Sequence, residues 1–364
     1  MPLVDALNEA ERVMVFCNAC RYCEGFCAVF PAMELRRTFC EQDLNYLANL
    51  CHNCRDCFYA CQYAPPHEFA LNIPKALAEL RMNTYLKFCW PPFLAGVFRR
   101  NGLVVSLTAA ISVMIIFLLT LFLRGPAKVF STYIGENAFY NVIPYAGIVL
   151  PVLVLGCLIL TSLLIGVYNF WRETGGKLSQ LGNLRANKTA MGDALRLKYL
   201  EGGGYGCNYP SDRFSMVRRW LHHFVFYGFM LCFASTTVAA IYQHFVHWSA
   251  PYPFLSWPVI LGTAGGVALS IGTGGLLYLK FRMDSIPASS QALGMDVSFL
   301  VLLFLTSLTG FMLMVFRETS AMGTLLAIHL GFAAGLFITM PYGKFIHTIY
   351  LYAALIKNAI EQSR

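Results

Sequence analysis

Eight of the thirteen cysteines form two identical sets with the spacing C-x2-C-x2-C-x3-C. Each cysteine of the second set follows its counterpart by 34 residues; the eight are Cys17, Cys20, Cys23, Cys27, Cys51, Cys54, Cys57 and Cys61. Thiolates at this spacing ligate [4Fe–4S] clusters, and the fourth cysteine of each set binds the other cluster. The spacing therefore predicts two [4Fe–4S] clusters that exchange one ligand.

The exchange gives each cluster four predicted ligands. One cluster takes Cys17, Cys20, Cys23 and Cys61, and the other takes Cys51, Cys54, Cys57 and Cys27. A disulfide framework or two structural zinc sites are the alternatives. Disulfides are rare in a reducing cytoplasm, and zinc modules usually space two cysteine pairs a dozen or more residues apart. Ala28 and Gln62 follow the fourth cysteines where the usual run has proline.

The segment between the two sets, Met33–Leu50, is predicted to be one helix, because leucine and phenylalanine recur at roughly helical spacing. Cys40 is expected to be a packed thiol within it, and the remaining cysteines outside the sets are expected to be ordinary core residues. A helical connection resembles the α-helical ferredoxin domains of the iron–sulfur subunits of succinate dehydrogenase and glycerol-3-phosphate dehydrogenase, over about 80 residues.

Histidines are the second group that can do chemistry. Six of the eight lie in or beside two apolar segments: His222, His223, His244, His247, His329 and His347. An imidazole within a membrane is costly unless it has a partner, so an intramembrane histidine indicates a functional site. Two histidines that face each other from different helices can ligate a b-type haem.

Helical spacing sorts these histidines into two levels. His329 and His347 are 18 residues apart, which places them on one face of a straight helix and about 27 Å apart. In an antiparallel arrangement, His347 would face His222 or His223 near the cytoplasmic side, and His329 would face His244 or His247 near the outer side. We therefore predict one haem b at the inner level and leave a second open. Interhelical hydrogen bonding and interfacial placement are the alternatives.

Arg218, Arg219 and Lys344 border the inner histidine level. Because arginine and lysine bind anionic oxygens, all three are candidates for contacts with haem propionates or a quinone headgroup. Ordinary anchoring of basic residues at the cytoplasmic face of the membrane is the alternative for each.

The elements that must position these residues are predominantly apolar helices. The chain is 57% hydrophobic and 13% charged, and a run of about 18 or more apolar residues predicts a transmembrane helix. Six such runs are Leu103–Leu123, Ala146–Phe170, Trp220–Gln243, Pro258–Leu279, Val297–Phe316 and Thr324–Ile346. None contains an acidic residue. Glycines in the fourth run are expected to let helices pack closely.

The predicted fold is all-α, with an α-helical ferredoxin domain at residues 1–95 and a six-helix cytochrome b-like membrane domain at 96–364. A loop at about 171–219 holds nine basic residues, whereas residues 244–257 hold none. By the positive-inside rule, this predicts a multi-pass inner-membrane protein with both termini in the cytoplasm. The net charge of +8 then reflects topology, and we expect no nucleic-acid partner. The N-terminus shows no signal-peptide pattern.

Longer motifs add a family resemblance. His329 together with the segment 340–347 resembles the final haem helix of nitrate reductase gamma-subunit-like cytochromes b. The cysteine sets, Gly202–Pro210 and Arg218–Phe229 resemble the tricarballylate (citrate) utilization protein B family over essentially the whole chain. This resemblance implies reoxidation of the reduced FAD of a partner dehydrogenase, which converts tricarballylate to cis-aconitate, and delivery of electrons to the quinone pool.

No substrate-oxidising site is expected on the chain itself, because no G-x-G-x-x-G motif follows a predicted strand. The flavin is therefore expected on a cytoplasmic FAD-dependent dehydrogenase. The alternatives are partnership with another flavoprotein, for example in cobalamin synthesis, or a membrane redox sensor or transporter. The absence of acidic residues from the apolar runs argues against a coupled transporter.

Overall fold

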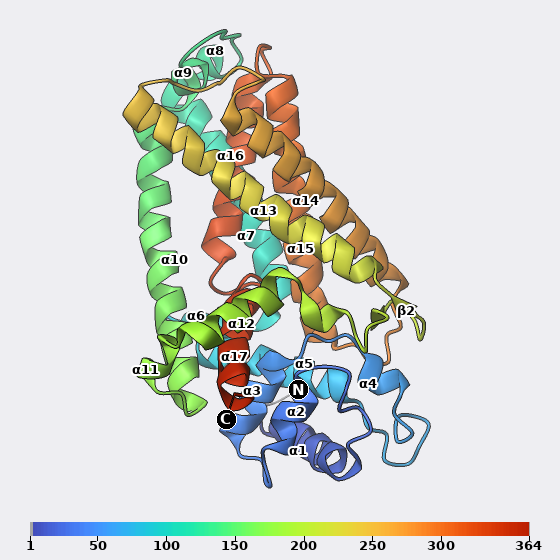
Figure 1. Cartoon of the computed structure of the whole chain (residues 1–364). Coiled ribbons are helices and arrows are strands. Elements are labelled where there is room, and N and C mark those ends of the chain that lie inside the picture. Colours follow the sequence, from blue (N-terminus) through green and yellow to red (C-terminus); the bar gives the residue numbers. More distant parts are fainter. Residues whose placement is uncertain (1–2, 364) are drawn as a thin grey trace.

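The computed structural model describes residues 3–363, which are predominantly helical. Within this range the strands form one short antiparallel ribbon, β1 (Cys207–Asn208) and β2 (Phe214–Ser215). Long helices stand above a lower layer of shorter helices, and both ends of the chain lie in that lower layer (Figure 1). The predicted all-α class is confirmed.

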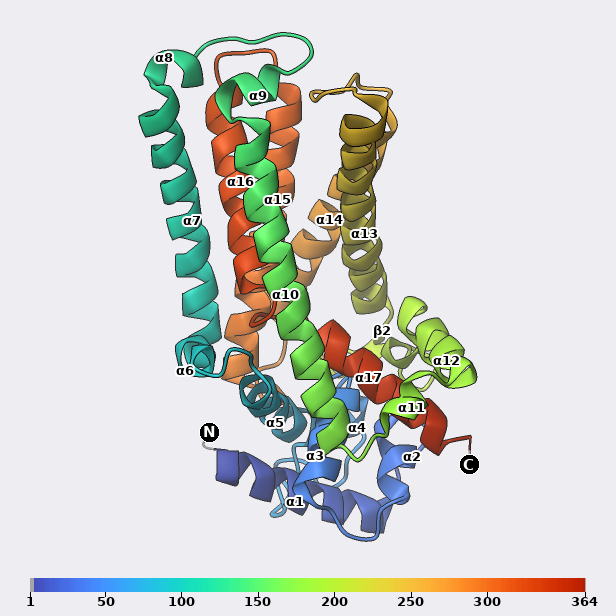
Figure 2. The same ribbon diagram turned by 90° about the vertical axis from the view of Figure 1, so that its left-hand side faces the viewer.

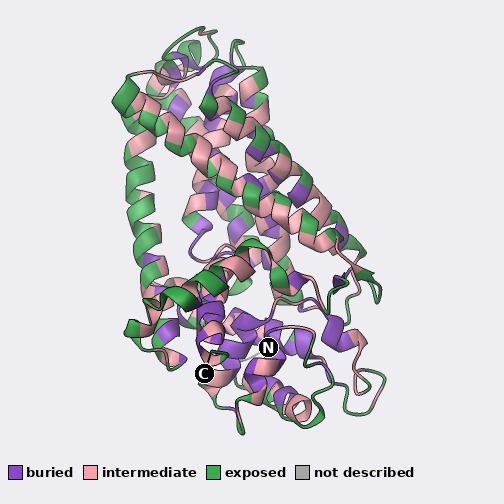
Figure 3. Ribbon diagram, viewed as in Figure 1, coloured by how far each residue is buried: buried purple, intermediate pink, exposed green. Residues whose placement is uncertain are grey.

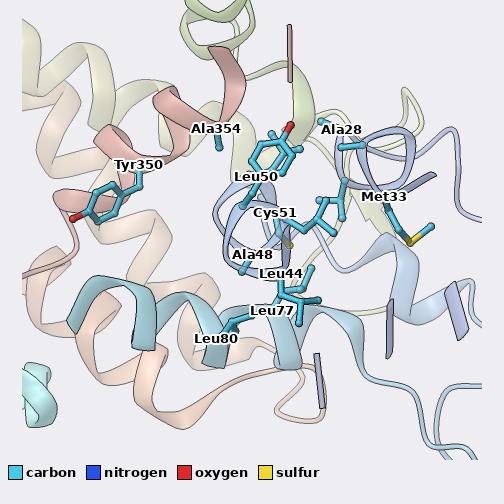
Figure 4. Packing of buried hydrophobic residues seen from close by; sticks show 14 of the residues in the cluster. Ala28, Met33, Leu44, Ala48, Leu50, Cys51, Leu77, Leu80, Tyr350 and Ala354 are labelled. Carbon is cyan, nitrogen blue, oxygen red and sulfur yellow. The ribbon is translucent and has the colours of Figure 1, made fainter. Parts of the chain in front are cut away.

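The lower layer is built first from the N-terminal helices. These are α1 (Leu3–Cys20), α2 (Val29–Glu34), α3 (Glu41–Leu50), α4 (Asp56–Tyr59) and α5 (Ile73–Lys87). The sequence encodes the start of α5 locally: the side chain of Asn72 accepts the backbone N–H of Lys75, and Pro74 occupies the first turn. Leu77 and Leu80 of α5 pack against Leu44 and Ala48 of α3 (Figure 4). This core supports both cysteine sets.

The prediction of a single helix over Met33–Leu50 is wrong. The chain leaves α2 after Glu34 and starts α3 at Glu41. Cys40 is extended at the N-cap of α3, and its Sγ lies 3.0 Å from Oδ2 of Asp43. The backbone N–H of Cys40 donates to the same carboxylate oxygen at 3.4 Å, which caps the first turn of α3. Cys40 is therefore an exposed capping residue and not a packed thiol.

Within residues 3–363, six helices are long and apolar enough to cross a membrane. They are Leu94–Arg124 (α6, Leu94–Val97; η1, Phe98–Arg100; α7, Asn101–Arg124), α10 (Tyr145–Glu173), α13 (Val217–Ile241, extended by the π-turn η3, Tyr242–Val246), α14 (Trp257–Arg282), α15 (Ser290–Val315) and α16 (Met322–Thr339). The short α8 (Pro126–Val129) and α9 (Ala138–Val142) lie together at the far end of the molecule (Figure 1). The segment between α10 and α13 holds α11 (Leu178–Leu181), α12 (Leu184–Leu195) and η2 (Lys198–Leu200).

Glycines allow α13 and α14 to pack closely along each other. A Cβ on Gly265 would lie 2.8 Å from the backbone nitrogen of Cys232, and one on Gly272 would lie 2.7 Å from that of Val225. Small residues at such positions let helix backbones approach. The predicted packing role of these glycines is confirmed.

The sixth apolar run does not form one helix. Helix α16 ends at Thr339, turns follow, and α17 (Ile346–Glu361) is a separate helix in the lower layer (Figure 2). Pro341 cannot donate a helical hydrogen bond, which favours this break. Tyr350 of α17 stacks on Tyr85 of α5 with ring centroids 5.7 Å apart. The prediction that His329 and His347 share a straight helix is therefore wrong.

Burial differs between the two parts of the molecule. Buried residues concentrate in the lower layer, whereas α10 exposes most of its length (Figure 3). The exposed side chains of α10 are apolar, for example Leu150 at 61% and Leu164 at 61%. Such a continuous apolar surface is expected on a helix that faces lipid.

Candidate functional site

The first cysteine set gathers with the last cysteine of the second. The pKa of the Cys17 thiol is raised to about 12, first by burial and then by the nearby Cys23, Cys61 and Cys20. The fold thus brings together the four residues that the exchanged assignment groups, although their ligation remains a prediction. Cluster ligands must be thiolates, so bound iron would supply the positive charge that this site otherwise lacks.

The second set gathers in the same way. Burial raises the pKa of Cys57 well above its usual value, with further contributions from Cys54, Cys27 and Cys51. Burial and then Cys51 raise the pKa of Cys27 to about 12. The backbone N–H of Asn53 donates to Sγ of Cys51 at 3.4 Å, a contact of the kind that tunes cluster potentials. The donor chemistry of both sets fits [4Fe–4S] ligation.

A single metal ion fits these cysteines less well. No three His, Cys, Asp or Glu residues within the described range are arranged to hold one ion. Zinc thiolates must all lie about 2.3 Å from the same ion, whereas a four-iron cluster binds each thiolate on a different iron. The described residues therefore contain no preformed single-ion site, and the choice between clusters and zinc rests on the cysteine spacing.

The two predicted ligand groups differ in exposure. In the first group Cys20 is exposed, Cys17 and Cys61 are half-buried and Cys23 is buried. In the second group Cys51, Cys54 and Cys57 are buried and Cys27 is half-buried. The first set therefore opens to the surface of the lower layer, while the second is enclosed between the first set and the long helices.

The loop Gly202–Pro210 encloses the second set, a role that the sequence analysis did not identify. The backbone N–H of Asn208 donates to Oδ1 of Asp56 at 2.8 Å. The fully buried Cys207 packs with Cys54 in one group of buried side chains. Gly202 has φ +56°, and a Cβ there would lie 2.3 Å from Oδ2 of Asp56. The glycine-rich motif was the available signal for this close approach.

The structure brings together one histidine pair at the inner level. The rings of His222 on α13 and His347 on α17 have centroids 6.3 Å apart and an interplanar angle of 72°. Metal–imidazole bonds of about 2 Å on opposite sides of one metal would place ring centroids roughly 6 Å apart. Nδ1 of His347 lies 2.5 Å from the carbonyl oxygen of Lys344. This contact fixes the ring and leaves Nε2 as the nitrogen that can bind a metal. Nδ1 of His222 is buried without a partner among the described residues. This pair fits a haem iron.

His223 has different neighbours. Its ring lies 5.7 Å from that of Trp220 and 5.8 Å from that of Tyr227, measured between centroids. Of the two adjacent candidates, the structure therefore sets only His222 against His347.

The predicted outer pair is not brought together in this way. Nδ1 of His329 lies 3.1 Å from Oγ1 of Thr309 on α15, while Nε2 of His244 lies 2.7 Å from the hydroxyl of Tyr145 on α10. His244 belongs to the π-turn at the end of α13, where the helix changes its phase. At this level the structure shows interhelical hydrogen bonding, which was the alternative prediction.

The three basic candidates all have protein partners. Arg218 donates to the carbonyl oxygen of Asn53 at 2.6 Å. Nη2 of Arg219 lies 2.7 Å from a carboxylate oxygen of Glu201, and Nζ of Lys344 lies 2.7 Å from Oδ1 of Asp296. Arg218 therefore binds the loop of the second cysteine set, and Lys344 belongs to an internal ion cluster.

Asp296 is the residue that the sequence analysis missed. It lies inside α15, is only 14% exposed, and forms ion pairs with both Lys280 and Lys344. Asp296 directly precedes the predicted run Val297–Phe316, so the expectation that the membrane helices lack acidic residues is wrong. Two ammonium groups compensate the carboxylate. A lack of acidic residues therefore does not distinguish this chain from a coupled transporter.

The molecule thus belongs to the class of proteins in which a domain with two four-cysteine sets packs against the end of six candidate membrane helices. Residues 10–87 match the family model "Citrate utilization protein B Fer4-like domain", and residues 96–364 match "Citrate utilization protein B". The chain is 49% identical over 364 residues to Citrate utilization protein B of Escherichia coli, covering 100% of this chain and 94% of that protein. It therefore belongs to the Citrate utilization protein B family, which confirms the predicted resemblance. No solved structure matches it.

Proposed function

We propose that this chain carries electrons from the reduced FAD of a cytoplasmic dehydrogenase to membrane quinone, using two [4Fe–4S] clusters and haem b. The observation that carries the proposal is the direct contact between the second cysteine loop and α13, one turn before His222. The cysteine domain and the inner histidine pair are thereby parts of one connected assembly. The name of the Escherichia coli relative supports a role in tricarboxylate use, and tricarballylate dehydrogenase is the proposed partner.

The different exposure of the cysteine sets supports an order of electron flow. The partner would dock near the first set, where Cys20 and Tyr22 are exposed, and the basic loop at about 171–219 would extend this docking surface. The second set is buried and contacts α13, so it would follow the first. We propose that the lower layer faces the cytoplasm of a cell with an inner membrane, because the segment at about 171–219, which holds nine basic residues, runs along that layer (Figure 1).

The residues have separate tasks in this proposal. When bound, the clusters and the haem accept and release electrons. The eight cysteines hold the clusters, and the Asn53 N–H bond to Cys51 adjusts the charge on one ligand. The Lys344 carbonyl keeps the His347 ring in position. The loop Gly202–Pro210 keeps water from Cys54.

The proposal is tested with membranes that contain the protein, a reduced flavoprotein partner and quinone. Haem b absorbance should show reduction by the flavoprotein and reoxidation by quinone. In a Cys54→Ser variant the haem should stay oxidised, because the second cluster lacks a ligand. Cys157→Ser, which changes an exposed cysteine of α10, is the matched control. Normal haem reduction in Cys54→Ser would overturn the proposed path.

A further inference from the structure

The end of α12, the start of α13 and Ala268 of α14 line an open cavity of about 450 Å³. Its walls include Arg219, Trp220, His223, Phe224 and Tyr227, all from the first turns of α13. His223 directly follows His222 in the chain, so the cavity lies on a neighbouring face of α13, one residue away from the inner histidine pair. We infer that it is the binding site for a quinone headgroup, an inference that rests on the function proposed above.

The position of the cavity suits a ligand that arrives through the bilayer. Trp220, Phe224 and Tyr227 are 59%, 43% and 45% exposed, and they lie at the end of α13 nearest the lower layer. Tryptophan and tyrosine are enriched where a membrane helix meets the interface. A headgroup could therefore enter sideways while its isoprenoid tail stays in lipid.

The walls suit a flat and neutral ring. Aromatic side chains pack favourably against planar rings, and three of them line this cavity. Tyr227 is itself held in place, because its hydroxyl donates to the carbonyl oxygen of Leu195 at 2.9 Å. The lining is thus mostly apolar, with Arg196, Arg219 and His223 as its polar residues.

Arg219 supplies a fixed hydrogen-bond donor at that polar end. Its Nε and Nη2 donate to the carbonyl oxygen of Arg196 at 3.1 and 2.7 Å, and Nη2 also pairs with Glu201 at 2.7 Å. Guanidinium has five N–H donors, and Nη1 has no partner among the described residues. Nη1 can therefore donate to a quinone carbonyl oxygen.

The lining favours an apolar ring over a phospholipid headgroup. Most of its residues are apolar or aromatic, and Glu201 already compensates the charge of Arg219, which leaves Arg196 as the other cation of the lining. A neutral carbonyl acceptor needs only the hydrogen bond. The larger cavity of about 800 Å³ lies in the lower layer and is lined by charged residues such as Asp5, Arg12 and Glu79, which suits an apolar ring poorly.

The test uses the full-length protein in lipid nanodiscs and a photoreactive azidoquinone with a short tail. After illumination, mass spectrometry should place the label within residues 195–227. Unlabelled short-chain quinone should compete with it. Arg219→Gln should weaken binding by about tenfold, the equivalent of one hydrogen bond near the upper end of the usual range. Trp220→Leu tests the aromatic wall separately.

The matched control is Trp257→Leu, which removes an exposed tryptophan at the opposite end of the helix pair, on α14 and should leave labelling unchanged. Labelling elsewhere, or competition by anionic phospholipid but not by quinone, would overturn the site. Quinone reduction by the unmodified protein is measured in parallel. If that reduction occurs while the label maps elsewhere, only the site is wrong; if no quinone is reduced, the proposed function itself fails.

Discussion

The guanidinium of Arg218 donates to the main-chain carbonyl oxygens of Asn53 at 2.6 Å and of His52 at 3.2 Å. It also lies over the ring of Tyr209, 4.9 Å from its centroid. Arg218 is four residues, or about one helical turn, before His222. One side chain thus fastens the loop of the second cysteine set to the helix that carries the inner histidine.

Arg218→Ala is expected to loosen this connection. Each lost hydrogen bond from a charged donor costs about 1.5–3 kcal/mol, and Lys cannot restore the forked geometry. The electron paramagnetic resonance signal of the second cluster should broaden, and haem reduction through the clusters should slow. Arg213→Ala, at an exposed position, is the control. An unchanged electron paramagnetic resonance spectrum in Arg218→Ala would show that the Arg218 contact does not position the loop of the second cysteine set.

The exchanged ligand assignment predicts which cluster each cysteine supports. Protein purified without oxygen should contain about eight cluster irons and eight sulfides, as two [4Fe–4S] clusters require. Cys61→Ser should damage the cluster of the first set, because Cys61 lies beside Cys17. Cys40→Ser, outside both sets, should have no effect. Loss of the second cluster alone in Cys61→Ser would contradict the exchange.

The inner histidine pair predicts a difference between two adjacent residues. His347→Ala and His222→Ala should each abolish a low-spin bis-histidine haem spectrum while the clusters remain, because the rings of these residues face each other. His223→Ala should retain that spectrum, since its ring packs on Trp220 and Tyr227. A bis-histidine spectrum that survives in His347→Ala would rule out this pair.

The ion cluster around Asp296 predicts a stability effect. Asp296→Asn leaves Lys280 and Lys344 without their shared counter-charge, which should lower the free energy of unfolding by about 3–5 kcal/mol. Adding Lys280→Met should recover part of the loss. Glu318→Gln, whose side chain is 58% exposed, should change stability by no more than about 1 kcal/mol. The free energy of unfolding is measured by denaturation in detergent. If Asp296→Asn and Glu318→Gln lower it equally, the role of Asp296 is refuted.

Local sequence patterns were sufficient to predict much of this structure. The cysteine sets are recognisable because cluster ligation requires fixed short spacings. The six long helices are recognisable because spanning a bilayer requires long apolar runs. Both signals are properties of contiguous sequence, and the six long helices overlap the six predicted runs, although the sixth ends at Thr339 and α17 continues separately in the lower layer.

Tertiary structure decided which of these residues meet. Nothing in the spacing distinguished His222 from His223, because adjacent helical positions differ only in direction and the choice depends on where α17 lies. Asp296 escaped notice because it borders an apolar run, and its two lysines come from other segments. Arg218 was a candidate for contacts with anionic ligands, but in the structure it binds main-chain carbonyl oxygens. A charged group pairs with whatever the fold brings within hydrogen-bond distance, and local spacing does not encode that partner.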